Sequence, residues 1–137
     1  MELGLQDKRA IVTGASRGIG LAIADALAAE GCAVSICARG QAGLDAAAAK
    51  ISARGGKVHA AACDVSDKDA LESYMDSAIG AFGGLDVLVN NPSGFGRTDD
   101  EEGWRVGLDV DLMALVRASW KAVDAMQAAG GGSIVHI

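Results

Sequence analysis

The sequence has a single proline, few aromatic residues and no long apolar run. One proline in 137 residues, with no low-complexity tract, argues against a linker or a disordered tail and favours one domain. No segment approaches the ~18 apolar residues of a membrane span, and the N-terminal residues lack the apolar stretch of a signal peptide. The formal net charge of −6 argues against general attraction to nucleic acid or to an anionic membrane.

Cysteine and histidine are also scarce. The three cysteines, Cys32, Cys37 and Cys63, are odd in number, and no pair has metal-ligand spacing. This usage predicts buried thiols in a reducing cytosol, and therefore a cytoplasmic protein without a metal site. His59 and His136 stand singly in short apolar segments, which favours a structural role over ligation or catalysis.

What the sequence does contain is a regular alternation of short apolar runs with longer segments of helical periodicity. The runs predict strands at 10–13, 33–38, 57–62, 85–89 and 133–137. The periodic segments predict helices at 19–30, 41–54, 66–82 and 98–129. This alternation is typical of right-handed βαβ units. We therefore predict an α/β fold, a doubly wound parallel sheet of Rossmann type with strand order 3-2-1-4-5.

Two helix starts carry the signature of a capping box. Ser66 stands three residues before Asp69, and Thr98 stands three residues before Glu101. In this motif the hydroxyl residue accepts a hydrogen bond from a free N–H of the first helical turn. Ser66 and Thr98 are accordingly predicted to be N-caps.

A glycine-rich turn, Thr13-Gly14-Ala15-Ser16-Arg17-Gly18-Ile19-Gly20, joins the first strand to the first helix. A phosphate at such a turn faces free backbone N–H groups and the positive end of the helix dipole. Gly14 permits the tight turn, Gly18 leaves room for a pyrophosphate, and Gly20 allows close packing of helix on strand. The hydroxyls of Thr13 and Ser16 can add hydrogen bonds. The strand before and the helix after favour a dinucleotide site over a ligand-free turn.

This turn resembles the cofactor motif of the short-chain dehydrogenase/reductase family. Three later segments agree: Cys63-Asp64-Val65, Asn90-Asn91 and 132–137, the family's fifth strand. The resemblance covers the whole chain. It implies that Ile19 belongs to the cofactor turn, that Asp64 and Val65 contact the adenine, and that Asn90 lies beside the nicotinamide ribose. The unit 1–137 is interpreted as a dinucleotide-binding domain that stops after strand five.

The end of the second predicted strand indicates which nicotinamide cofactor is bound. An acidic residue there selects NAD, whereas an arginine accommodates the 2′-phosphate of NADP. The strand ends at Cys37-Ala38-Arg39-Gly40, without a carboxylate. Arg17, in the turn, can reach the same phosphate and form paired, charge-assisted hydrogen bonds. The predicted cofactor is NADP(H), although either arginine alone could be a solvated surface charge.

Two positions depart from the family pattern. Pro92 replaces the alanine of Asn-Asn-Ala-Gly, which removes a backbone donor and fixes φ. Asp111 stands where the family has an asparagine of the proton relay. An ionised aspartate accepts hydrogen bonds but cannot donate them, so Asp111 is a candidate for either an altered relay or a structural carboxylate.

The catalytic residues of the family are expected beyond Ile137, where a serine follows strand five and a Tyr-x-x-x-Lys lies in the next helix. Tyr74 cannot replace that tyrosine, since Ala78 stands where the lysine is needed. The resemblance implies an oxidoreductase that transfers hydride between nicotinamide and a small carbonyl or alcohol substrate. It implies that the longer parent forms a homodimer or homotetramer. A non-catalytic nucleotide-binding module and an inactive fragment are the alternatives.

Overall fold

Five parallel strands form one sheet in the computed structural model, which describes residues 2–137. The strands are β1 (Arg9–Thr13), β2 (Ala33–Ala38), β3 (Val58–Ala62), β4 (Val87–Asn90) and β5 (Ser133–His136). The helices are α1 (Gly18–Ala29), α2 (Gln41–Ser52), α3 (Lys68–Phe82), α4 (Glu101–Gly107), the π-helix η1 (Leu108–Met113) and α5 (Ala114–Ala128). The strand order is β3-β2-β1-β4-β5, which confirms the predicted topology.

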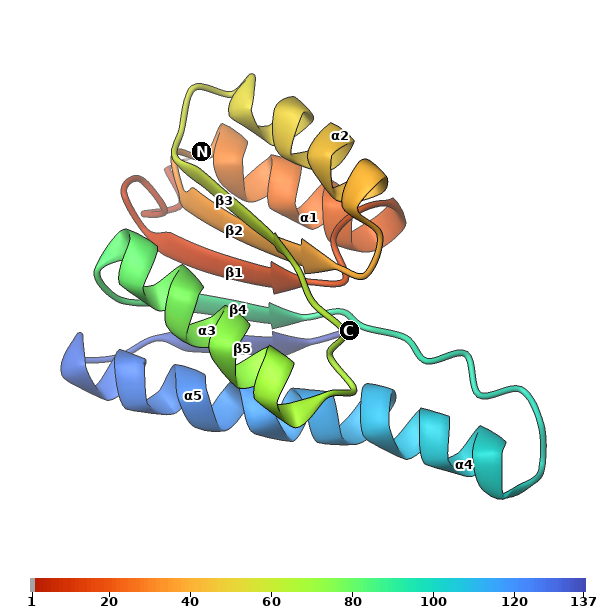
Figure 1. Cartoon of the computed structure of the whole chain (residues 1–137). Helices are drawn as coiled ribbons and strands as arrows, with labels where there is room; N and C mark the ends of the chain where they lie inside the picture. Colours follow the sequence, from red (N-terminus) through yellow and green to blue (C-terminus); the bar gives the residue numbers. More distant parts are fainter. Residues whose placement is uncertain (1) are drawn as a thin grey trace.

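Helices cover both faces of the sheet (Figure 1). Successive side chains of a strand point to opposite faces, so each strand contributes to two cores. On one face Val12 and Ile36 pack with Leu44 of α2. On the other face Ile11 and Leu88 pack with residues of α3 and α5. The short, nearly continuous apolar runs of the central strands are thus explained by burial on both sides.

The N-caps of α3 and α4 differ from the prediction. Asp67, not Ser66, accepts a hydrogen bond from the N–H of Ala70 at 3.0 Å. Asp100, not Thr98, accepts from the N–H of Gly103 at 2.8 Å. In both cases a carboxylate displaces the hydroxyl, because a negative charge at a helix N-terminus is stabilised by the helix dipole as well as by the hydrogen bond.

The predicted long helix of 98–129 is present, but it begins at Glu101 and contains a π-helical turn. Segment η1 interrupts the α-helical pattern between α4 and α5, and the Ala114 N–H bonds to the carbonyl of Asp109, five residues back. Such turns contain one more residue than the α-helix and are frequent at functional sites. Asp111, the candidate from the sequence, lies within it.

Strand β5 lies at an edge of the sheet, as expected from the sequence, and pairs with β4. The outer face of the long helix also carries exposed apolar side chains. Leu108, Leu112 and Trp120 are 48%, 51% and 63% exposed. An open strand edge beside an apolar helix face is a surface suited to association.

Candidate functional site

A cavity of about 950 Å³ opens at the carboxyl ends of the strands. This is the edge at which parallel α/β sheets bind their ligands, near the point where the strand order reverses. The reversal lies between β1 and β4, whose chains continue into the glycine-rich turn and into a loop that begins at Asn91. Nine of the twelve sequence-predicted residues line this cavity: Gly14, Ser16, Arg17, Gly18, Ile19, Arg39, Asp64, Val65 and Asp111. Thr13, Gly20 and Asn90 do not.

The glycine-rich turn has the shape of a phosphate cradle. Gly14 and Gly18 have φ values of 63° and 59°, which side chains rarely adopt. A Cβ on Gly18 would meet no atom within 4 Å, so that side of the turn is open, whereas a Cβ on Gly14 would overlap the carbonyl of Asn91. Gly20 is buried, and a Cβ there would overlap the carbonyl of Gly14. The close packing predicted for Gly20 is therefore present.

The N-terminus of α1 presents its N–H groups without a competitor. Its N-cap residue is Arg17, and no side chain of the described chain caps it by a hydrogen bond. The first turn contains no acidic residue either. The free N–H groups and the positive dipole end are therefore available to an anion.

Two arginines stand on the wall beside this turn. Arg17 and Arg39 are both exposed, and both line the cavity. Asp64 follows β3, and its carboxylate is hydrogen-bonded to a neighbouring residue. Its Oδ1 accepts from the Ser66 Oγ at 2.7 Å and from the Ser66 N–H at 3.0 Å. These bonds hold the pKa of Asp64 below its ordinary value, and the positive charge of Arg39 lowers it further. Asp64 is thus an ionised carboxylate within electrostatic range of Arg39.

The paired asparagines have different positions. Asn90 belongs to β4 and is buried, and its Nδ2 lies 3.2 Å from Nδ1 of His136 on β5. Asn91 lines the cavity, where its Nδ2 donates to the carbonyl of Gly14 at 3.1 Å and its N–H donates to the buried Thr13 Oγ1 at 3.2 Å. Sequence reasoning selected Asn90 and missed Asn91. The signal that could have found Asn91 is that it follows the strand, where the chain turns toward the ligand edge.

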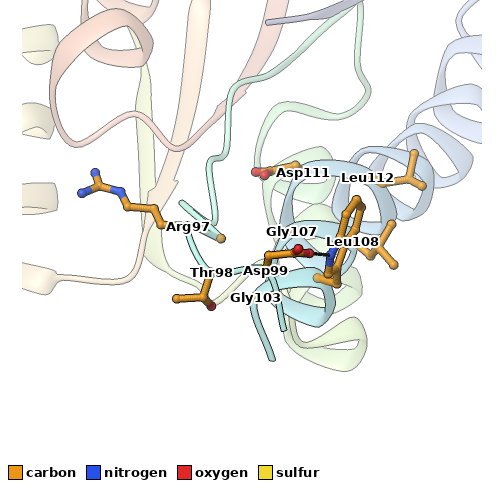
Figure 2. A pocket seen from close by; sticks show the side chains of 10 residues that line it. Arg97, Thr98, Asp99, Gly103, Gly107, Leu108, Asp111 and Leu112 are labelled. Carbon is orange, nitrogen blue, oxygen red and sulfur yellow. Dashed lines mark hydrogen bonds between the residues drawn. The ribbon is translucent and has the colours of Figure 1, made fainter. Parts of the chain in front are cut away.

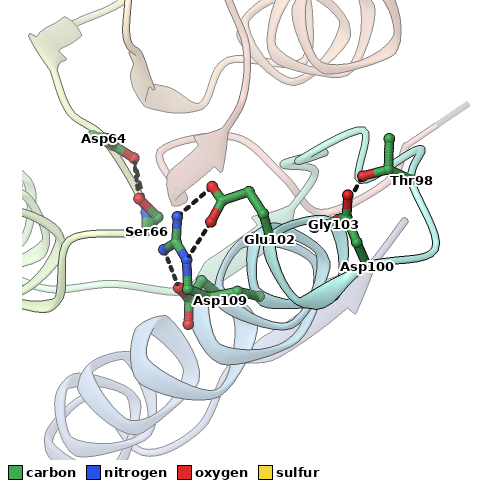
Figure 3. A network of polar contacts seen from close by, with 8 residues as sticks. Asp64, Ser66, Thr98, Asp100, Glu102, Gly103 and Asp109 are labelled. Carbon is green, nitrogen blue, oxygen red and sulfur yellow. Dashed lines mark hydrogen bonds and ion pairs between the residues drawn. The ribbon is translucent and has the colours of Figure 1, made fainter.

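A third cavity arginine, Arg105 of α4, was also missed. Its guanidinium bonds both carboxylate oxygens of Glu102, at 2.6 and 3.0 Å, and Oδ2 of Asp109 at 3.1 Å. Figure 3 shows this group in the same region as Asp64 and Ser66. The hydrogen bonds and positive charge of Arg105 lower the pKa of Glu102, because they stabilise its ionised carboxylate. Arg105 is therefore held by its own helix, in contrast to Arg17 and Arg39.

Among the remaining titratable groups, Cys63 lines the cavity, whereas Tyr74, His59, Cys32 and Cys37 do not. Tyr74 is buried under the sheet, and its hydroxyl lies 2.6 Å from Ser35 Oγ. Burial raises the pKa of Tyr74 well above its ordinary value. His59 Nδ1 lies 2.8 Å from the same Ser35 oxygen, which places His59 in a structural network. Cys32, Cys37 and Cys63 are free and buried.

Neither a metal-ligand cluster nor a membrane-spanning helix is found in the part of the chain that the structure describes. Within residues 2–137, no three His, Cys, Asp or Glu side chains are grouped so as to hold a metal ion. None of the helices in this part of the chain has the length and apolarity needed to cross a membrane.

Comparison with known proteins agrees with this geometry. The family model for short chain dehydrogenases matches residues 8–137. An uncharacterized oxidoreductase of Methylorubrum extorquens is 42% identical over 97% of the chain, which covers 55% of that protein. L-sorbose reductase of Gluconobacter frateurii, solved with NADPH and L-sorbose, is 37% identical with a TM-score of 0.93; the match covers 99% of this chain and 54% of that one.

An NAD⁺-bound xylitol dehydrogenase is 27% identical with a TM-score of 0.89, over 96% of this chain and 53% of that one. Relatives thus bind either cofactor. The chain spans about half the length of the curated relatives it matches. The glycine-rich turn, the parallel sheet of order 3-2-1-4-5 and the match over residues 8–137 together show that the chain belongs to the short-chain dehydrogenase/reductase family of oxidoreductases.

Proposed function

We propose that this chain supplies the NADP(H) site of an oxidoreductase that transfers hydride between the nicotinamide and a small carbonyl or alcohol substrate. The observation that carries the proposal is that Arg17 and Arg39 line the same cavity and that Arg17 stands at the uncapped N-terminus of α1. The strand β2 ends at Ala38 and is followed by Arg39 and Gly40, so no carboxylate is present there to accept from a ribose 2′-OH.

The residues present fit this cofactor. The open side of Gly18 leaves space for the pyrophosphate next to free N–H groups. Arg17 and Arg39 can each form paired hydrogen bonds with a 2′-phosphate. Asp64 and Val65 line the cavity and are proposed to contact the adenine, as the resemblance implies, and Asn91 joins the turn to the loop after β4. When bound, the cofactor supplies or accepts the hydride.

The catalytic serine, tyrosine and lysine of the family are proposed to belong to the same protein beyond Ile137. An acid must protonate the developing alkoxide during carbonyl reduction, and Tyr74 is buried elsewhere. A cytoplasmic location is proposed on the strength of three free, buried thiols, which a reducing compartment maintains. A homodimer or homotetramer is proposed on the strength of the exposed apolar face of the long helix.

Titration with NADPH and NADH tests the cofactor. The unmodified protein is expected to prefer NADPH, and Arg39→Asp should lose about 1–3 kcal/mol of NADPH binding, as for hydrogen bonds to charged groups. Lys50→Asp is the matched control. It changes the net charge by the same amount as Arg39→Asp, but Lys50 lies on α2 and does not line the cavity. Equal affinities for the two cofactors in the unmodified protein would refute the assignment to NADP(H).

Sequencing the reading frame beyond Ile137 separates the alternatives. A continuing chain with a serine and a Tyr-x-x-x-Lys supports the oxidoreductase. A stop codon there favours a nucleotide-binding module if NADPH still binds, and an inactive fragment if it does not.

A further inference from the structure

Asp111 contacts the loop that follows β4. Its Oδ1 accepts a hydrogen bond from the N–H of Gly94 at 2.8 Å. This loop begins at Asn91 and contains Pro92, the other departure from the family pattern. The carboxylate of Asp111 is therefore bonded to the loop that carries Pro92, two residues after that proline.

The loop is packed closely on the helix at this point. A Cβ on Gly94 would lie 2.9 Å from the Val106 carbonyl and 3.0 Å from the Val110 Cβ. The absence of a side chain thus allows Gly94 to approach near enough for its N–H to reach the carboxylate. Asp111 lies on the π-helix η1, at the point where the long helix departs from α-helical spacing. Figure 2 shows Asp111 and Leu112 pointing to opposite sides of the helix.

The next residue of the loop has a strained backbone. Phe95 has φ 51°, a value that is an outlier for a bulky residue. Phe95 is one of the residues that line the cavity and is 60% exposed, and the guanidinium carbon of Arg97 lies 5.4 Å from the centroid of its ring. A strained residue persists only when its surroundings hold it. Here the Asp111–Gly94 bond holds the peptide immediately before Phe95.

We propose that Asp111 is a positioning residue that fixes the loop 92–95 and so presents Phe95 to the cofactor cavity. The proposal rests on the proposed function, because the bound molecule is NADPH. Asp111 acts through the Gly94 N–H and moves no proton. A carboxylate suits this role because the Gly94 N–H is a hydrogen-bond donor. Asp111 therefore needs only an acceptor oxygen and no donor of its own.

Amide exchange of Gly94 in the unliganded chain tests the contact. Asp111→Ala should accelerate deuterium exchange at the Gly94 N–H by about tenfold or more, since the amide loses its charged acceptor. Asp111→Asn keeps an acceptor oxygen at the same place, so exchange should stay within about threefold of the unmodified chain. Asp109→Ala is the matched control, because it removes a carboxylate of η1 that bonds Arg105 and not Gly94. Unchanged exchange in Asp111→Ala would overturn the proposal.

NADPH affinity tests the consequence. Asp111→Ala should weaken binding by about three- to tenfold, and Asp111→Asn should restore most of it. Phe95→Gly relieves the backbone strain, so its effect should differ between the unmodified chain and Asp111→Ala, as expected for two residues acting on one loop. Exchange that responds while NADPH affinity does not would overturn the positioning role in binding. If NADPH binds neither the unmodified chain nor any of the variants, the proposed function fails. Exchange at the Gly94 N–H still decides in that case whether Asp111 fixes the loop.

Discussion

Replacement of Gly18 by valine should abolish cofactor binding while leaving the fold intact. Gly18 has φ 59°, and a Cβ there would point into open space within the turn. A non-glycine residue in this conformation costs about 1–2 kcal/mol. That cost is small compared with a typical unfolding free energy of about 5–15 kcal/mol, so Tm should fall by several degrees without loss of the folded state.

The effect on binding should be much larger. The valine side chain would occupy the place of the pyrophosphate, which would then lose hydrogen bonds to the N–H groups at the start of α1. Each hydrogen bond to a charged group is worth about 1.5–3 kcal/mol. Loss of two corresponds to a decrease in affinity of more than about 100-fold.

Gly83→Val provides the matched control. Gly83 has φ 71°, its Cβ would also meet nothing within 4 Å, and it ends α3 outside the cavity. The two variants should therefore lose similar stability in thermal unfolding, but only Gly18→Val should lose NADPH binding in a fluorescence titration. Unchanged NADPH affinity in Gly18→Val would show that this turn does not bind the pyrophosphate.

Three further predictions concern stability, pH and association. Arg9 bonds Asp86 through its side chain and backbone N–H, which lowers the pKa of Asp86; Asp86→Asn should cost about 1–2 kcal/mol near neutral pH. The difference should begin to shrink as pH falls below about 3.9, the ordinary pKa of the unfolded carboxyl, and should vanish only below the lowered pKa of the folded protein, so a pH-independent difference in urea unfolding would contradict it. Burial lowers the pKa of His59 below 6.5, so the unfolded chain binds a proton more readily than the folded chain does. The free energy of unfolding should therefore decline as pH falls through 6.5, and His59→Gln should remove this part of the pH dependence. An unchanged pH profile of stability in His59→Gln would argue against this role of His59. The 137-residue chain alone should show no carbonyl reduction and should self-associate in light scattering. Val135 lies on the edge strand β5 and is 43% exposed, so Val135→Lys should reduce the association. A monodisperse unmodified monomer or measurable turnover would contradict these expectations.

The order of strands and helices could be predicted because the apolar periodicity is strong and the glycine-rich turn has a definite place in a βαβ unit. Cap positions could not, because Ser66 and Thr98 compete with neighbouring aspartates at the same helix start. The hydroxyls of Ser66 and Thr98 instead donate to Asp64 and Asp100. Which residue caps a helix depends on a local balance of hydrogen bonds that the motif alone does not settle.

The site residues on strand ends and on η1 were harder to predict for a related reason. The position of Asn90 inside β4 and of Asn91 beyond it depends on where the strand ends, to within one residue. The π-helix adds one residue to a turn, and a pattern of period 3.6 does not reveal where that residue is added. Asp111 lies in this π-helical turn, and its contact with Gly94, 17 residues away in the chain, was not visible in the sequence.

Asn91 makes the two sides of the strand-order reversal one mechanical unit. Its side chain and backbone bond Gly14 and Thr13, so movement of the loop after β4 is coupled to the glycine-rich turn. Arg39 stands outside this unit, at the far end of β2. Of the two arginines proposed to bind the 2′-phosphate, Arg39 can therefore be replaced without changing this unit, whereas Arg17 belongs to the turn itself. Any insertion in the loop after Asn91 would be transmitted to the glycine-rich turn.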